Sequence, residues 1–92
     1  MIESFKHKGL ERFFTGSDKR AIPAQSAARI ERLLDRLEAS VRAEDMDLPG
    51  NKFHVLKGDR AGEYAVTVTG NLRITYRFEG QHASAVNLED YH

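Results

Sequence analysis

The stretch EYAVTVTGNLRITYRF, residues 63–78, carries the clearest structural signal in the chain. Apolar and polar residues alternate on both sides of Gly70-Asn71, which is typical of two half-buried strands joined by a tight antiparallel turn. The apolar face of this hairpin is expected to hold Tyr64, Val66, Val68, Leu72, Ile74, Tyr76 and Phe78. Arg73, Thr75 and Arg77 should then point to the other face, which we expect to be partly open to water.

The segments around this hairpin extend it into a meander of four strands. Residues 53–57 are predicted to form the preceding strand, and residues 82–88 the last one. Turn-forming residues separate these strands at 58–62 and 79–81. A connector over residues 44–52 precedes them and contains the strong turn signal Pro49-Gly50-Asn51.

The first half of the chain has helical periodicity instead. Residues 8–15 predict a short helix, with Gly16 as the stop that follows its last residue. A second helix of about five turns is predicted over residues 23–42, with Pro23 in its first turn. Its apolar stripe comprises Ala27, Ile30, Leu33, Leu34, Leu37 and Val41. The charged residues of the opposite face indicate a surface in contact with solvent.

These elements define a single domain over residues 1–92. Residues 1–5 are expected to form a short strand, so the order is strand, helix, helix and a four-strand antiparallel meander. This is an α+β fold in which both helices pack on one face of the sheet. A chain of 92 residues is long enough for one modest core.

The composition of the chain limits the classes of protein to which it can belong. The chain has no Cys, no long apolar run and no signal-peptide pattern at residues 1–6, so we expect a cytoplasmic protein without disulfides or a membrane segment. Its 14 Lys and Arg balance 14 Asp and Glu, which argues against strong salt-driven binding to free RNA. A locally positive site remains compatible with this balance, because Lys57, Arg73 and Arg77 lie on or beside the expected open face.

Several catalytic patterns are missing. There is no phosphate-binding glycine loop, no nucleophile elbow and no HExxH motif. His54, Asp90 and His92 could in principle form a facial triad for iron or zinc, but no sequence pattern fixes their geometry.

Polar residues of the second half suggest a different chemistry. If the last strand pairs near the first ones, a concave patch would collect His54, Lys57, Arg73, Asp90, Tyr91 and His92. Cleavage of RNA by its own 2′-hydroxyl needs a base, an acid, a cation for the phosphorane and a ring on which a nucleotide stacks. Such a patch supplies all four, and the reaction requires no metal or cofactor. Simpler interpretations are an exposed structural His54, a merely solubilising Arg77 and a Tyr91 that plugs the core.

At these residues the chain resembles a known family. The similarity includes Ile2-x-Ser4-Phe5, Pro49-Gly50-Asn51, His54-x-Leu56-Lys57-Gly58-Asp59-Arg60-x-Gly62, Asn71-x-Arg73-Ile74 and Glu89-Asp90-Tyr91-His92. On these motifs the chain is identified as a member of the HigB-type toxins of the RelE/ParE superfamily. Two positions depart from the pattern, since relatives often have an aromatic or apolar residue at Glu63 and an aromatic one at Leu72.

The resemblance implies a microbial RNase fold and the cutting of mRNA in the A site of the 70S ribosome. It also implies a HigA-like helix-turn-helix antitoxin as partner, with DNA contacted only through the antitoxin complex. The residues at the family's catalytic positions are His54, Asp90, Tyr91 and His92. Those at its phosphate-binding positions are Lys57 and Arg73.

We hypothesise that His92 acts as base or acid, that Asp90 activates the 2′-hydroxyl or orients His54, and that Tyr91 stacks on the nucleotide. Two other functions fit the same fold: inhibition of DNA gyrase, as by ParE toxins, and plain RNA or protein binding. A set of two His, an Asp and a Tyr favours the enzyme, because a gyrase inhibitor does not need it.

Overall fold

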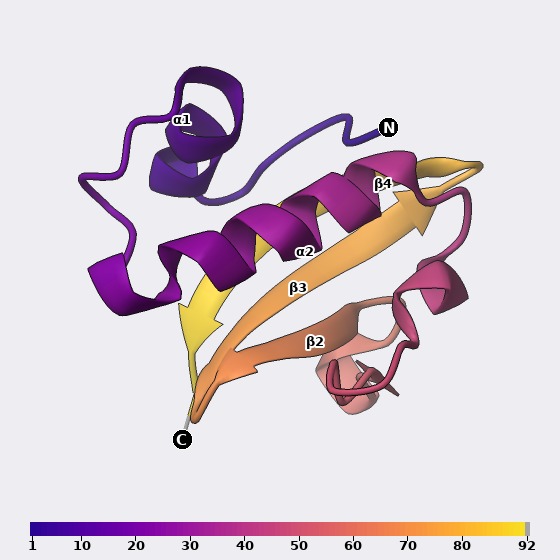
Figure 1. The fold of residues 1–92 in the computed structure, drawn as a ribbon. Helices are drawn as coiled ribbons and strands as arrows, with labels where there is room; N and C mark the ends of the chain where they lie inside the picture. The colour runs from indigo at the N-terminus through magenta and orange to yellow at the C-terminus, as the bar shows by residue number, and fades with distance from the viewer. Residues whose placement is uncertain (92) are drawn as a thin grey trace.

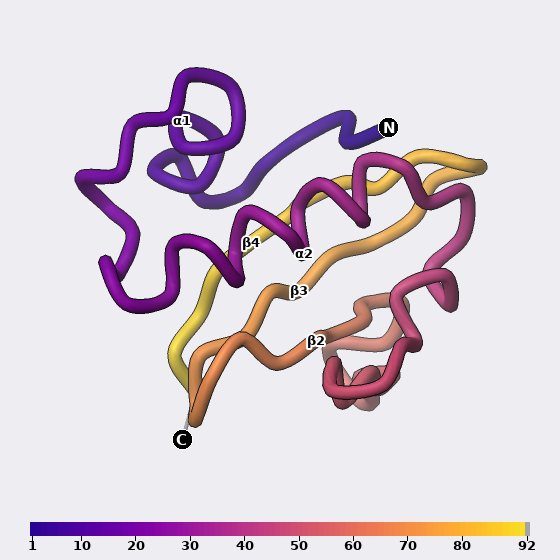
Figure 2. The backbone as a smooth tube through the Cα atoms, in the orientation of Figure 1, coloured from indigo at the N-terminus to yellow at the C-terminus, as the bar shows by residue number. Residues whose placement is uncertain are grey.

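A computed structural model describes residues 1–91 of the chain (Figures 1 and 2). It contains the helices α1 (Lys8–Gly16) and α2 (Ala27–Ala39) and the strands β1 (His54–Val55), β2 (Tyr64–Thr69), β3 (Leu72–Glu79) and β4 (His82–Asp90). Short 3-10 helices are η1 (Ala24–Ser26), η2 (Ala43–Met46) and η3 (Gly58–Arg60). None of the helices in this described part is long and apolar enough to cross a bilayer.

The strands form one antiparallel sheet in the order β1-β2-β3-β4, which confirms the meander. Tyr64 lies opposite Tyr76, and Arg73 lies opposite Glu89 on β4. Figure 1 shows α2 lying across one face of this sheet. The predicted α+β class and the helices on one sheet face are therefore confirmed.

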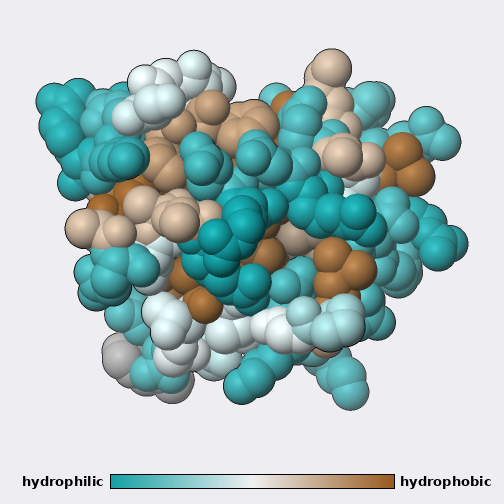
Figure 3. Space-filling model, in the orientation of Figure 1, coloured by the Kyte–Doolittle hydropathy of each residue, from teal (hydrophilic) through white to brown (hydrophobic). Residues whose placement is uncertain are grey.

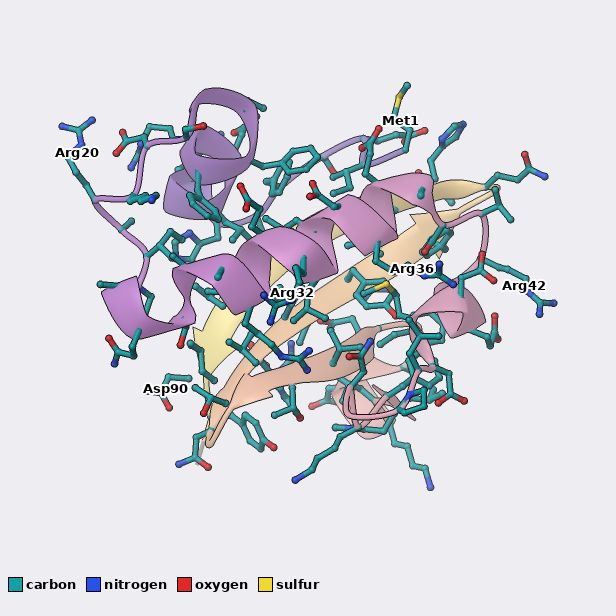
Figure 4. The ribbon with its side chains drawn as sticks, in the orientation of Figure 1. Met1, Arg20, Arg32, Arg36, Arg42 and Asp90 are labelled. Atoms are coloured by element: carbon teal, nitrogen blue, oxygen red, sulfur yellow. The ribbon has the colours of Figure 1, made fainter. Side chains whose placement is uncertain are left out.

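The core lies between α2 and the sheet, where alternation and helical periodicity place their apolar faces together. Helix α2 contributes Ile30, Leu33, Leu34 and Leu37, all buried. Tyr76 is fully buried among them and donates its hydroxyl hydrogen to the Ala43 carbonyl at 3.0 Å. Burial raises the pKa of Tyr76, so its hydroxyl stays protonated. The outer face of α2 is hydrophilic, as expected, and includes Arg32 and Arg36 (Figures 3 and 4).

The second helix is shorter than predicted. Pro23 precedes the 3-10 turn η1, and the α-helix proper ends at Ala39. The prediction that Val41 belongs to the apolar stripe is wrong, since Val41 is 52% exposed. The chain turns here because the Asp45 carboxylate accepts hydrogen bonds from the backbone N–H groups of Val41 and Arg42.

Two of the predicted strands are shorter in the structure than expected. Residues 1–5 form only isolated parallel bridges to β4, Ile2 with Ala83 and Phe5 with Val86. The first meander strand is limited to His54–Val55, because the chain enters η3 at Gly58. Strand β1, at the edge of the sheet, is therefore too short to position functional side chains without other elements.

The first helix ends one residue later than predicted. Gly16 is still helical, and Ser17 takes the left-handed conformation, with φ 59°, that glycine usually provides. Its backbone N–H bonds the carbonyls of Arg12 and Phe13, which satisfies the helix end despite the side chain.

The face of β3 turned away from the helices is less open than predicted. Arg73 is only 8% exposed and Thr75 1%, whereas Arg77 is exposed. Arg60 of η3 reaches Glu89 on β4, so the loop after β1 crosses this face of the sheet. The prediction of exposure is therefore wrong for Arg73 and Thr75 and correct for Arg77.

Candidate active site

Arg73 stands at the centre of a polar cluster on this face. Its Nε and Nη2 atoms both lie 2.7 Å from Oε1 of Glu89, the residue directly opposite on β4. Its guanidinium carbon lies 4.0 Å from the centre of the Tyr91 ring, a cation–π contact. The buried cation is therefore fixed in place by a carboxylate and an aromatic ring.

Arg60 joins the same cluster from η3. Its Nη1 donates to Glu89 Oε1 at 2.9 Å, and its Nη2 donates to Glu63 Oε1 at 2.8 Å. Glu63 also lies 3.6 Å from the guanidinium of Arg77. Three arginines therefore share two carboxylates, which leaves the cluster with a net positive charge.

The pKa directions agree with this geometry. Partial burial raises the pKa of the Glu89 carboxyl, but the hydrogen bonds from Arg60 and Arg73 outweigh it, so the pKa is lowered overall. The hydrogen bonds from Arg60 likewise lower the pKa of Glu63. Both carboxylates are ionised at neutral pH and hold the guanidinium groups by charge-assisted bonds.

Tyr91 and Asp90 follow at the end of β4. The Tyr91 backbone N–H donates to the Asn71 carbonyl at 3.0 Å, which ties Tyr91 to the turn between β2 and β3. The Tyr91 side chain is 37% exposed, so one part of its ring contacts Arg73 and another part faces solvent. Asp90, which is labelled in Figure 4, is exposed and lies opposite Leu72 at the end of the sheet.

His54 lies at the opposite edge of the sheet. The condition that the last strand pairs near the first ones is not met, because β2 and β3 separate β1 from β4. Three strand spacings of about 4.8 Å place the His54 and β4 backbones about 14 Å apart. The structure therefore brings together Arg73 and Tyr91, and it does not bring the His54 backbone beside them.

The His54 ring has a defined orientation nonetheless. Its Nδ1 lies 2.8 Å from the Lys52 carbonyl oxygen, and the residue is exposed. Lys57 is also exposed and precedes η3, the helix whose Arg60 reaches the cluster. The loop after β1 thus extends from the His54 side of the face to the Arg73 side.

His92 lies outside the described residues, so its role and the suggested facial triad stay hypotheses. Among residues 1–91 no three His, Cys, Asp or Glu side chains are grouped as metal ligands would be. A cavity between the two helices contains none of the candidate site residues.

Sequence reasoning missed Glu89 and Arg60 as members of the cluster. Both occur within the motifs of the resemblance, but neither belongs to its expected site. The register offered a signal for Glu89, because opposite charges on neighbouring antiparallel strands pair when they lie opposite each other. Arg60 offered none, because its reach depends on the path of the loop.

Comparison with known proteins places this chain in a family. The model described as "RelE-like toxin of type II toxin-antitoxin system HigB" matches residues 3–92. This chain belongs to that family. It is also similar to "Endoribonuclease HigB" of Proteus vulgaris, with 40% identity over 92 residues that cover 100% of both chains.

The fold is shared more widely. The chain is similar to the solved structure of a YoeB/ParE toxin from Agrobacterium tumefaciens, with a TM-score of 0.68, 18% identity and 100% of both chains covered. At this identity the likeness shows the fold alone. The expected RelE-like α+β fold and the membership in the HigB-type toxin family are both confirmed.

Proposed function

We propose that this toxin is a ribosome-dependent endoribonuclease that cuts mRNA in the ribosomal A site and thereby inhibits translation. Endoribonuclease activity is supported by family membership and by the full-length relative from Proteus vulgaris. Membership in a toxin–antitoxin system implies an antitoxin partner. We further propose that this partner is a HigA-like helix-turn-helix protein and that the toxin acts in the cytoplasm, where ribosomes are.

The observation that carries the proposal is the fixed cation beside a half-exposed ring. Arg73 is 8% exposed and is held by Glu89, while Tyr91 contacts it and still reaches solvent. An mRNA phosphate near Arg73 would receive a preorganised positive charge, and its nucleotide could stack on the outer part of Tyr91. Lys57 would add a second phosphate contact from the loop.

The proposed reaction uses the 2′-hydroxyl of the substrate as nucleophile. A base removes its proton, Arg73 stabilises the charge of the phosphorane, and an acid protonates the departing 5′-oxygen. His54, Asp90 and His92 are the proposed proton-transfer residues, with no metal or cofactor. The product of such a cut is a 2′,3′-cyclic phosphate and a free 5′-hydroxyl.

The ribosome requirement agrees with the charge of the chain. Its net charge is zero, so bulk electrostatics would not gather free RNA, whereas the local cluster is positive. A ribosome that already holds mRNA removes the need for strong independent RNA binding. We therefore expect no cleavage of the same mRNA in its free form.

Purified ribosomes carrying a defined mRNA test the proposal. New 5′ ends inside the A-site codon, and none without ribosomes, support it. The alternative, a ParE-like inhibitor of DNA gyrase on the same fold, predicts inhibition of supercoiling without cleavage. If saturating toxin causes neither cleavage nor inhibition of supercoiling, the enzyme and gyrase proposals are both wrong. Only a binding function then remains.

A further inference from the structure

We infer that the segment Asn51-Lys52, tied to α2 by Arg29, fixes the tautomer of His54 so that its Nε2 is the proton acceptor. This inference rests on the proposed function, because it assigns His54 the base role that the sequence left open. Arg29, Asn51 and Lys52 are positioning residues in this account, since they act through His54.

The His54 ring contacts the main chain of Lys52. His54 Nδ1 lies 2.8 Å from the Lys52 carbonyl oxygen. A carbonyl oxygen only accepts hydrogen bonds, so Nδ1 must carry the hydrogen. In a neutral imidazole the other nitrogen then has the lone pair, and the hydrogen bond of one nitrogen sets the role of the other. Nε2 is therefore the basic atom of His54.

The backbone at Lys52 directs this carbonyl toward the ring. Lys52 has φ +48°, a left-handed conformation that non-glycine residues rarely adopt. Such a conformation is unfavourable for a residue with a side chain and persists only where neighbouring contacts impose it. It comes two residues before His54 and bends the chain so that the carbonyl of Lys52 meets the ring.

Asn51, which is only 5% exposed, is held by a set of hydrogen bonds. Its side-chain amide donates to the Met46 carbonyl at 3.0 Å, its backbone N–H donates to Leu48, and its backbone carbonyl accepts from Thr67 on β2. Two of these bonds stay within the connector just before Lys52, and the third comes from strand β2 of the sheet. Together these bonds hold the connector before β1 against the sheet.

Arg29 joins this connector to helix α2. Its Nη2 donates to the Thr67 carbonyl at 2.9 Å, to the Gly50 carbonyl at 3.1 Å and to Asn51 Oδ1 at 3.3 Å. Its Nε reaches the Val68 carbonyl at 3.4 Å. One guanidinium therefore joins α2, the loop and β2, and a lysine could not make so many bonds from fixed directions.

In the proposed step each bond that forms is matched by a bond that breaks. The 2′-hydroxyl proton passes to His54 Nε2, the 2′-oxygen bonds to phosphorus, and the bond from phosphorus to the 5′-oxygen breaks. The 5′-oxygen takes its proton from a second acid, the role left to His92. As Nε2 gains the proton, the Nδ1–H bond to the Lys52 carbonyl becomes charge-assisted and therefore stronger.

The test is nitrogen NMR of the imidazole side chains in the full-length protein, combined with kinetics on ribosomes. At a pH where the ring is neutral, we expect Nδ1 of His54 to be protonated and Nε2 not. Lys52→Gly should keep this tautomer, because the carbonyl belongs to the main chain. Arg29→Lys should give a mixture of tautomers and lower kcat about 10-fold with KM unchanged.

Arg32→Lys is the matched control, since Arg32 lies one turn further on α2 and is exposed. It should keep the tautomer and a kcat within twofold of the wild type. A wild-type His54 protonated on Nε2, or equal effects of the two lysine variants, would overturn the inference. Wild-type cleavage by His54→Ala would instead refute the proton-transfer role that the proposed function gives His54, whatever the tautomer.

Discussion

Replacing Glu89 with Gln tests whether this carboxylate holds the site together. Glu89 accepts hydrogen bonds from two arginines, of which the Arg73 side chain is only 10% exposed. Glutamine keeps the shape and one acceptor oxygen but removes the charge. The substitution leaves Arg73 with a neutral partner in a poorly solvated place, which is costly for a guanidinium that cannot lose its proton.

The expected loss of folding free energy follows from the hydrogen bonds that change. Hydrogen bonds to charged groups contribute about 1.5–3 kcal/mol, and neutral ones about 0.5–1.5 kcal/mol. The Arg73 bond therefore loses about 1 kcal/mol. The more exposed pair with Arg60 contributes up to about 1 kcal/mol. We expect a total loss of about 2 kcal/mol, which lowers Tm by roughly 8–16 °C in a domain of this size.

Thermal and urea unfolding measure this loss, with Glu79→Gln as control at an exposed position. The control should stay within about 0.5 kcal/mol of the wild type. A Glu89→Gln protein as stable as the control would refute the reasoning, because the carboxylate would then contribute nothing to holding Arg73.

The same pair of proteins should differ in pH dependence. The pKa of Glu89 is lowered from its usual value of 4.5, so its contribution to the free energy of unfolding is fully present above that pH. It is lost as the pH falls through the lowered pKa of the folded state. The stability difference between the wild type and Glu89→Gln should therefore shrink below about pH 4.5.

Three further predictions concern single positions. Tyr91→Ala should reduce cleavage on ribosomes about 10-fold through lost stacking, while Tyr91→Phe keeps most activity; equal losses would contradict stacking. Ser17→Gly should raise the free energy of urea unfolding by about 0.5–1 kcal/mol, because φ is 59°; a decrease would contradict this. Gly62→Ala should lower it by about 1–2 kcal/mol, because φ is +94° and a Cβ would lie 2.8 Å from Arg77 Nη1; unchanged stability would contradict this.

The fold could be predicted because its signals are local. Alternation around Gly70-Asn71 located β2 and β3, and the stripe from Ile30 to Leu37 located α2. Element ends were harder, because they depend on single hydrogen bonds such as those of Asp45 that turn the chain at Val41. Such bonds leave no periodic trace in a sequence.

The candidate site was predictable in its residue types but less so in its geometry. Arg73 and Tyr91 were expected in one patch, and the structure places them in contact. The burial of Arg73 could not be foreseen, because it depends on the path of the loop that carries Arg60. Pairing of the last strand with the first was expected only as a condition, and the strand order separates His54 from β4.

The role of the mRNA 2′-hydroxyl is the central claim, and one substituted mRNA tests it directly. Ribosomes are loaded with an mRNA that has a single 2′-deoxynucleotide at the cleavage position of the A-site codon, or with the unmodified mRNA. The account predicts that the toxin cuts the unmodified strand, leaves a 2′,3′-cyclic phosphate and spares the substituted one. Cleavage of both strands at the same rate would contradict it.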